Sequence, residues 1–309
     1  MELYFPIAEI SLNVILVLLL GGVSGVAAGM FGIGGGFILT PLLIFIGVPP
    51  AVAVASQANQ MVGASLVGTL THWRRKNVDA KMGCVLLVGA LSGSYGGVLL
   101  FSHLQSLGQI DLVISLCYIV FLGSIALLML LESVKSLRRD NTPKPLNTSL
   151  KYRLHHSWLM RTLPFKMKFP QSKLYISALL PIVIGMLVGL LVATMGIGGG
   201  FIMIPAMVYI LGMPGQMVIG TSLFQIIFTT ALTTLLQSIH NQTVDVMLAF
   251  LLLIGAVVGV QFGTKWGQKI KPETARLFLA VLALGIALKM ATGLLLEPEN
   301  PYTLEVIPQ

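Results

Sequence analysis

The feature that most constrains this chain is a series of long apolar segments separated by short polar connections. Leu12–Leu20, Leu174–Val192 and Leu248–Val260 contain no charged side chain. A helix needs about 20 predominantly apolar residues to cross a bilayer, and segments of this kind recur along the chain. Charged residues make up only 10% of the sequence, whereas soluble domains carry about 25%. We therefore predict an all-α polytopic membrane protein, placed as a multi-pass protein in the cell inner membrane.

The chain contains an internal duplication. The seven residues Gly32–Ile38 recur without change as Gly196–Ile202. Further matches follow in the same order in both halves: Pro41 with Pro205, Ser56-Gln57 with Thr221-Ser222, Gln60 with Gln225, and Gly89, Gly93 and Gly97 with Gly255, Gly259 and Gly263. Chance similarity between apolar segments would not preserve this order, so the sequence predicts two repeated halves.

The positive charges indicate that the two halves are inverted in the membrane. All Lys and Arg residues except Lys289 lie in 74–81, 135–173 and 265–276. Short loops rich in Lys and Arg stay cytoplasmic, so the loops 102–110 and 240–245 should face outward. Each basic loop of one half then corresponds to a non-basic loop of the other, which is the plan of inverted repeats in secondary transporters. A parallel arrangement of four plus four spans is the alternative, but it would place a basic loop outside.

Each half is expected to contain five helical segments, of which the second is short. The expected segments are 10–31, 35–47, 51–73, 82–103 and 110–132, followed by 174–195, 199–211, 216–239, 246–268 and 275–296. The predicted organisation is a first membrane repeat over 1–132, a basic cytoplasmic linker over 133–173, a second membrane repeat over 174–296 and a C-terminal tail over 297–309.

The two glycine-rich motifs are predicted to interrupt helices. Each glycine costs about 1 kcal/mol in a helix interior relative to alanine. Irregular backbone inside a membrane is tolerated where it is buried in protein or lines a wet cavity, and free N–H groups at the start of the next helix form an anion site. The candidate backbone donors are Gly32, Gly34, Gly35, Gly36, Gly196, Gly198, Gly199 and Gly200. Close helix packing is the alternative, and we favour it for the glycines of 89–97 and 255–263.

Polar residues follow each glycine motif at matched positions. They are Ser56, Gln57 and Gln60 in the first half, and Thr221, Ser222 and Gln225 in the second. Hydroxyls and amides can donate hydrogen bonds to an oxyanion without placing a formal charge in the bilayer. Hydrogen bonding between helices explains the same residues equally well, and the sequence leaves both readings open.

Three further polar residues are candidates: one lies a few residues beyond the middle of the last segment, and two lie at segment ends. Lys289 is the one cation outside the basic segments, and it either attracts an anion or extends to the outer headgroups. His72 and His240 lie at the ends of equivalent segments, where a histidine can titrate near neutral pH or cap the helix at the interface.

Several classes of function lack their motifs. The chain contains no Gly-x-x-x-x-Gly-Lys phosphate loop and no His-Glu-x-x-His or Gly-x-Ser-x-Gly motif. Acidic residues such as Asp111 and Glu132 lie at or near segment ends, so the usual carboxylate proton relay is missing. The net charge of +8 is confined to the loops, which argues against nucleic acid. We predict a protein that is not an enzyme and needs no metal or cofactor.

With its two Gly-Ile-Gly-Gly-Gly-Phe motifs and their trailing prolines, the sequence resembles the TauE/SafE family of sulfite-exporter-like permeases. The resemblance extends from about Val14 to Met290 and includes the 56–57 and 221–222 pairs and both glycine ladders. It implies an inner-membrane permease for small sulfur-containing anions such as sulfite or organosulfonates. The linker is longer and more basic than the family leads us to expect, so no function is carried onto it.

These observations predict a secondary permease for a small anion, acting in export, with the lipid bilayer as its environment. Homo-oligomerisation is left open. The alternatives are uptake of another small anionic solute, a membrane enzyme, and a non-transporting scaffold or assembly factor that uses the basic linker to bind a partner.

Overall fold

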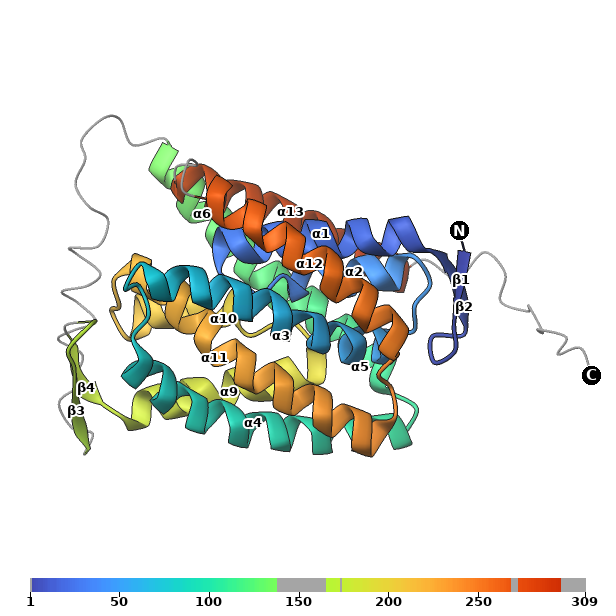
Figure 1. The fold of residues 1–309 in the computed structure, drawn as a ribbon, viewed down its shortest axis with the longest axis horizontal. Helices are drawn as coiled ribbons and strands as arrows, with labels where there is room; N and C mark the ends of the chain where they lie inside the picture. The colour runs from blue at the N-terminus through green and yellow to red at the C-terminus, as the bar shows by residue number, and fades with distance from the viewer. Residues whose placement is uncertain (1, 138–164, 173, 268–271, 296–309) are drawn as a thin grey trace, which may run out of the picture.

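A computed structural model of the chain describes residues 2–137, 165–172, 174–267 and 272–295. This part of the chain is helical apart from two β-hairpins, and its long helices lie side by side in one bundle (Figure 1). Most of the predicted linker, 138–164, and the predicted tail lie outside the described residues. The all-α polytopic fold predicted from the sequence is confirmed.

The elements of the two halves follow one another in the same order. The first half contains β1 (Glu2–Phe5), β2 (Ile10–Asn13), α1 (Val14–Phe31), α2 (Gly36–Phe45), α3 (Pro50–Arg74), α4 (Ala80–Ser106), α5 (Ile110–Cys117), the π-helix η1 (Tyr118–Leu122) and α6 (Gly123–Leu137). The second contains β3 (Lys166–Phe169), β4 (Leu174–Ser177), α9 (Leu179–Met195), α10 (Gly200–Pro205), η2 (Ala206–Ile210), α11 (Gly215–Leu236), η3 (Gln237–Asn241), α12 (Val246–Trp266) and α13 (Pro272–Leu295).

The predicted segments 10–31 and 174–195 are wrong at their first residues. Strand β2 pairs with β1 in an antiparallel hairpin, and β4 pairs with β3 in the same way. Helix α1 begins only at Val14 because Asn13 has the extended backbone of an N-cap residue and its side chain accepts a hydrogen bond from the Ile15 N–H. The last residues of β1 and β3, Phe5 and Phe169, are buried and anchor the hairpins.

The two hairpins lie at opposite ends of the bundle (Figure 1). Hairpin β1–β2 precedes the first helix of one half, and β3–β4 precedes the first helix of the other. This placement agrees with the opposite orientations that the basic loops predict for the two halves.

The predicted glycine ladders bring helices of different halves into close contact. A Cβ atom on Gly97 of α4 would lie 2.7 Å from the carbonyl oxygen of Leu190 in α9. The glycines of α12 approach α1 in the same way, and a Cβ on Gly259 would lie 2.9 Å from the backbone nitrogen of Val26. Real Cβ atoms do not fit at such distances, so the close-packing reading of these glycines is confirmed.

Helices α3 and α11 occupy the centre of the bundle, between the α1–α12 pair and the α4–α9 pair (Figure 1). Six helices of the described chain are long and apolar enough to cross a membrane by length and composition. Large apolar side chains such as Leu19, Leu128 and Leu288 are exposed on the outside of the bundle, where a bilayer would cover them. Helices α3 and α11 therefore turn one face toward the core of the bundle, while side chains such as Leu66 and Leu70 of α3 are exposed on its outside.

Candidate transport site at the two helix breaks

Both glycine motifs interrupt a helix, as predicted. Helix α1 ends at Phe31 with Gly32 as its C-cap, and α2 begins at Gly36. Helix α9 ends at Met195 with Gly196 as its C-cap, and α10 begins at Gly200. Three glycines in each break have positive φ: Gly32 (70°), Gly34 (86°) and Gly35 (79°), and Gly196 (65°), Gly198 (85°) and Gly199 (57°). Only glycine adopts these angles without strain, which is why the motif is the same in both halves.

The breaks contain buried backbone donors. The N–H groups of Gly34 and Gly35, and those of Ile197, Gly198 and Gly199, have no acceptor among the residues that the structure describes. The Gly36 N–H also lacks one. All of these residues are buried. Unpaired buried N–H groups are rare in folded proteins, and several at one place are typical of a site that binds an acceptor.

The two breaks lie against each other. A Cβ on Gly34 would lie 3.1 Å from the Gly198 carbonyl oxygen, and one on Gly200 would lie 2.7 Å from that of Gly32. The phenyl rings that follow the breaks, Phe37 and Phe201, stack with their centroids 4.8 Å apart. The predicted glycines of the two halves are therefore brought together at one place.

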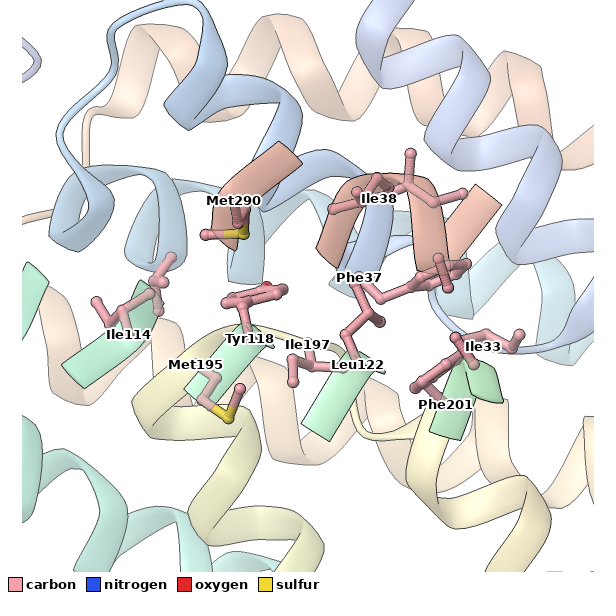
Figure 2. Close-up of a cluster of buried hydrophobic side chains, with 14 of the residues drawn as sticks. Ile33, Phe37, Ile38, Ile114, Tyr118, Leu122, Met195, Ile197, Phe201 and Met290 are labelled. Carbon is pink, nitrogen blue, oxygen red and sulfur yellow. The ribbon is translucent and has the colours of Figure 1, made fainter. Parts of the chain in front are cut away.

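An apolar layer covers one side of the breaks. Figure 2 shows Tyr118 and Leu122 of η1 and Met290 of α13 in the same cluster as the stacked rings of Phe37 and Phe201. All of these side chains are buried. The sequence did not identify this layer, since its members come from segments that are distant along the chain.

Gln57 and Ser222 hold the breaks across the two halves. The Gln57 amide donates a hydrogen bond to the Gly196 carbonyl oxygen and accepts one from the Thr40 hydroxyl. The Ser222 hydroxyl lies 3.1 Å from the Gly32 carbonyl oxygen. Gln57 and Ser222 were predicted at matched positions, and each contacts the break of the opposite half.

Gln60 and Gln225 are also buried, but they have fewer partners. The Gln60 amide nitrogen lies 3.3 Å from the Ser24 hydroxyl, and that of Gln225 lies 2.7 Å from the Thr229 hydroxyl. The Oε1 atoms of both glutamines lack a partner in the described chain. A Cβ on Gly35 would lie 2.5 Å from the Ser24 carbonyl oxygen, so Gln60 reaches the first break through Ser24, a residue that the sequence reasoning missed.

The other predicted hydroxyls, those of Ser56 and Thr221, are hydrogen-bonded to the backbone of two aspartates. The Ser56 hydroxyl oxygen accepts a hydrogen bond of 2.9 Å from the Asp245 N–H, and Thr221 accepts one of 3.0 Å from the Asp79 N–H. Both hydroxyls are buried. They connect the breaks' flanking helices to the ends of the bundle, and no contact between these two residues and a break is found in the described chain.

Asp79 and Asp245 fasten the hairpins. The Asp79 carboxylate accepts hydrogen bonds from the Ser172 N–H (3.0 Å) and hydroxyl (2.6 Å) at the β3–β4 turn and from the Met82 N–H (3.0 Å) at the start of α4. The Asp245 carboxylate accepts bonds from the N–H groups of Ile7 and Ala8 at the β1–β2 turn. Each aspartate thus joins a hairpin of one half to a helix of the other.

These aspartates were missed in the sequence, although one signal pointed to them. Each directly precedes a long apolar helix, and Asp245 accepts hydrogen bonds from the N–H groups of Met247 and Leu248 as an N-cap residue does. The dipeptides Phe5-Pro6 and Phe169-Pro170 also repeat with the glycine motifs. This repeat could have revealed that the hairpins belong to the duplicated unit.

The remaining polar candidates lie away from the breaks. Lys289 is exposed, and its ammonium group lies 4.6 Å from the centroid of the Phe45 ring at the end of α2. His72 lies near the C-terminal end of α3. Among the described residues no group of His, Cys, Asp and Glu could hold a metal ion.

Two helix breaks in contact, set between central helices of two repeated halves, define the class of protein. Interrupted helices at the interface of two repeats form the solute site in many secondary transporters, and irregular backbone at membrane depth is tolerated only where it is buried in protein or lines a water-filled cavity. The fold and site are those of a multi-pass membrane transporter.

Comparison with known proteins gives the family. The model of the family "Sulfite exporter TauE/SafE" matches residues 17–290. The chain belongs to the TauE/SafE family, as the sequence resemblance indicated.

Two curated relatives from Bacillus subtilis match the chain over nearly their whole length. The chain is 26% identical over 277 residues to the probable membrane transporter protein YjnA of Bacillus subtilis, an alignment that covers 89% of the chain and 98% of that protein. It is 25% identical over 287 residues to YunE of the same organism, covering 90% and 97%. A 109-residue stretch is 28% identical to the sulfite exporter TauE/SafE family protein 3 of Arabidopsis thaliana, covering 35% of the chain and 23% of that protein. No solved structure matches the chain.

Proposed function

We propose that the protein is a secondary permease that exports a small anion, sulfite or an organosulfonate, through a site formed by the two helix breaks. The observation that carries this proposal is the set of buried backbone N–H groups at Gly34–Gly36 and Ile197–Gly199 for which the described residues offer no acceptor. An anion supplies several acceptor atoms, and it would replace its hydration shell with these donors.

The site suits an anion for two further reasons. The positive end of the α2 dipole lies at the first break, because α2 begins at Gly36. No Lys or Arg is needed beside the ligand, and a site of neutral donors binds an anion weakly enough to release it. The names of the family and of the Arabidopsis relative support sulfite as the first anion to test.

Export of an anion requires no coupling ion when the cell interior is negative. A potential of 100 mV drives each negative charge outward with about 2.3 kcal/mol. The described carboxylates that are buried, Asp79 and Asp245, lie at the ends of the bundle and bind hairpins, and neither lies at the breaks. The proposed mechanism is therefore uniport driven by the membrane potential.

The test is efflux of sulfite from proteoliposomes with an imposed inside-negative potential. The key variant is Gly36→Val, whose side chain would enter the opposite break, because even a Cβ at this position would lie 3.0 Å from the Ile197 carbonyl carbon. The matched control is Gly285→Val, since a Cβ on Gly285 meets nothing within 4 Å. Both proteins are first checked for a native elution volume and unfolding temperature.

We expect efflux that increases with the potential in the wild type and in Gly285→Val, and a loss of about tenfold or more in Gly36→Val, which corresponds to about 1.4 kcal/mol. Full activity of a folded Gly36→Val protein would contradict a site at the breaks. Absence of flux above empty liposomes, for sulfite and for a panel of organosulfonates, would contradict the proposed anion export.

A further inference from the structure

Helix α3 is the exception among the long helices of the bundle. It has 25 residues, yet it is not among the six helices that are apolar enough to cross a membrane. One stripe of this helix, at i, i+4, i+8, i+12 and i+15, carries four of its polar side chains and a methionine. The residues of this stripe are Gln57, Met61, Ser65, Thr69 and His72. Residues at these spacings share one face of a helix.

The end of this stripe nearer the N-terminus of α3 lies at the breaks. Gln57 donates to the carbonyl oxygen of Gly196. Met61 lies between the breaks: a Cβ on Gly198 would lie 3.0 Å from the Met61 sulfur, and a Cβ on Gly34 would meet the Met61 methyl group. The stripe therefore starts where the proposed anion site lies.

The part of the stripe nearer the C-terminus of α3 is buried and polar, but its side chains have no hydrogen-bond partners among the described residues. Ser65 is 0% exposed and Thr69 is 5% exposed. Their hydroxyls, and Nδ1 of His72, form no hydrogen bond within the described chain. A buried polar group without a partner costs about 1–3 kcal/mol, so three in succession on one face are not expected in a core that serves only packing.

Other buried or half-buried hydroxyls in this bundle form hydrogen bonds within their own helix. Thr71 donates to the Val67 carbonyl oxygen at 2.9 Å, Thr229 to that of Gln225 at 3.0 Å and Thr230 to that of Ile226 at 2.8 Å. Such bonds to the carbonyl four residues earlier satisfy a hydroxyl in apolar surroundings. Ser65 and Thr69 do not make them, and they retain their full capacity for another ligand.

The stripe ends beside positive charge. Arg74, Arg75 and Lys76 come after His72, separated from it by Trp73, and all three are exposed. They lie at the end of the bundle that carries hairpin β3–β4, because the following residue Asp79 binds Ser172 of that hairpin. A cluster of exposed cations raises the local concentration of anions at this end.

The equivalent stripe of α11 differs in its hydrogen bonding. Thr230 corresponds to Ser65 and Gln237 corresponds to His72 in the duplication. The Thr230 hydroxyl is satisfied within its own helix, and the Gln237 amide donates to the Ala193 carbonyl oxygen at 3.1 Å and accepts from Asn241. The Thr234 hydroxyl, which corresponds to that of Thr69, has no partner within the described chain. The stripe of α11 is therefore unpartnered at one of these three positions, whereas the stripe of α3 is unpartnered at all three.

We propose that Ser65, Thr69 and His72 line the path by which a small oxyanion and its water pass between the breaks and the basic end of α3. The inference rests on the proposed function, since it extends the same site toward one face of the membrane. The hydroxyls and the imidazole form hydrogen bonds with the anion one after another. Arg74, Arg75 and Lys76 attract the anion to the entrance of the path at the basic end of α3. The neutral stripe lets the anion move because no fixed charge holds it.

The test is the accessibility of single cysteines to charged reagents. Cys84 and Cys117 are first replaced by alanine, and Ser65→Cys and Thr69→Cys are made in that background. The variants, in sealed vesicles of each orientation, are exposed to an anionic sulfonatoethyl methanethiosulfonate and to its cationic trimethylammonium analogue. The modified fraction is read by mass spectrometry of the purified protein. Leu66→Cys and Leu70→Cys are the matched controls, since these neighbours are 47% and 55% exposed on the outside of the bundle.

We expect both stripe cysteines to react from the basic side, faster with the anionic reagent, and about tenfold faster than the lipid-facing controls, because a thiol in lipid does not ionise. Stripe cysteines that react no faster than the controls, or only from the opposite side, would overturn the path. Labelling is independent of flux: absence of labelling with intact sulfite efflux overturns the path alone, whereas absence of efflux in the wild type overturns the proposed function.

Discussion

Gln57 and Ser222 occupy equivalent positions in α3 and α11, yet they hold the opposite breaks with different strength. Gln57 bonds both the Gly196 carbonyl oxygen and the Thr40 hydroxyl. The Ser222 hydroxyl has one hydrogen, which lies between the carbonyl oxygens of Gly32 (3.1 Å) and Ile219 (2.9 Å). The second break therefore depends on a single amide, whereas the first is held by a shared and weaker bond.

This difference predicts unequal effects of truncation. Gln57→Ala should lower the free energy of unfolding by about 1–3 kcal/mol, because it leaves two buried polar groups without a partner, and Ser222→Ala should lower it by about 1 kcal/mol or less. The measurement is thermal unfolding of the purified proteins in detergent. The control is Gln261→Ala, an exposed amide on α12. An equal loss of unfolding free energy in Ser222→Ala and Gln57→Ala would show that the hydrogen bond to Gly196 does not stabilise the protein more than the one to Gly32.

At the scale of elements, two hairpins of four-residue strands are held at the ends of a helical bundle. An isolated hairpin of this size is not stable in water. Asp79 and Asp245 supply the missing stability through hydrogen bonds from N–H and hydroxyl groups of the hairpin turns. Hydrogen bonds to a charged acceptor contribute about 1.5–3 kcal/mol each, so each hairpin is expected to depend on one carboxylate.

Asp79→Asn should release hairpin β3–β4, and Asp245→Asn should release β1–β2. An asparagine turns one acceptor oxygen into an NH₂ donor, which would face the N–H groups that the carboxylate accepts. The measurement is hydrogen–deuterium exchange of the peptides that cover 166–177 and 2–13. Asp111→Asn is the control, because Asp111 is exposed in the first turn of α5. Equal exchange of both hairpins in every variant would contradict the assignment of one aspartate to each hairpin.

The glycine ladders make a second prediction at this scale. Gly93→Val should disrupt the α4–α9 contact, because a Cβ at this position would lie 2.7 Å from the Met186 carbonyl carbon. Gly96→Val, three residues away on the same helix, should be tolerated, since a Cβ there meets nothing within 4 Å. The yield of monodisperse protein and its unfolding temperature distinguish the two. Equal yields and unfolding temperatures of the two variants would show that α4 and α9 can move apart without loss of the fold.

At the scale of the whole molecule, the basic loops and the hairpins point to halves of opposite orientation. The loop after α3 contains Arg75, and the corresponding loop after α11 contains Gln242; both residues are exposed. If the halves are inverted, these loops face opposite sides of the membrane.

Single cysteines at these two positions test the orientation. In a background without Cys84 and Cys117, Arg75→Cys should react with a membrane-impermeant maleimide only in inside-out vesicles, and Gln242→Cys only in intact cells. Reaction of both from the same side would contradict the inverted arrangement and favour parallel halves. Permeabilised membranes, in which both cysteines should react, provide the control.

Much of the architecture could be predicted from local sequence. Consecutive glycines interrupt a helix wherever they occur, because their cost in a helix depends on the backbone alone. The two breaks, the glycine ladders and the apolar segments follow from this kind of reasoning. The hairpins could not be found in the same way, since Ile10–Asn13 and Leu174–Ser177 continue an apolar segment, and only the pairing with β1 and β3 makes them extended.

The sequence by itself determined that this chain crosses the membrane as helices, that one glycine motif recurs in it, and that Gly32–Gly36 and Gly196–Gly200 interrupt helices. These properties depend on the apolar content of segments and on the conformational freedom of glycine, which are local. Only the tertiary structure decided which groups meet. Gln57 reaches the break of the opposite half, Asp79 binds a hairpin 93 residues away, and the Ser65 hydroxyl finds no hydrogen-bond partner among the described residues. Each of these is a relation between atoms far apart in the chain, and no spacing in the sequence encodes it.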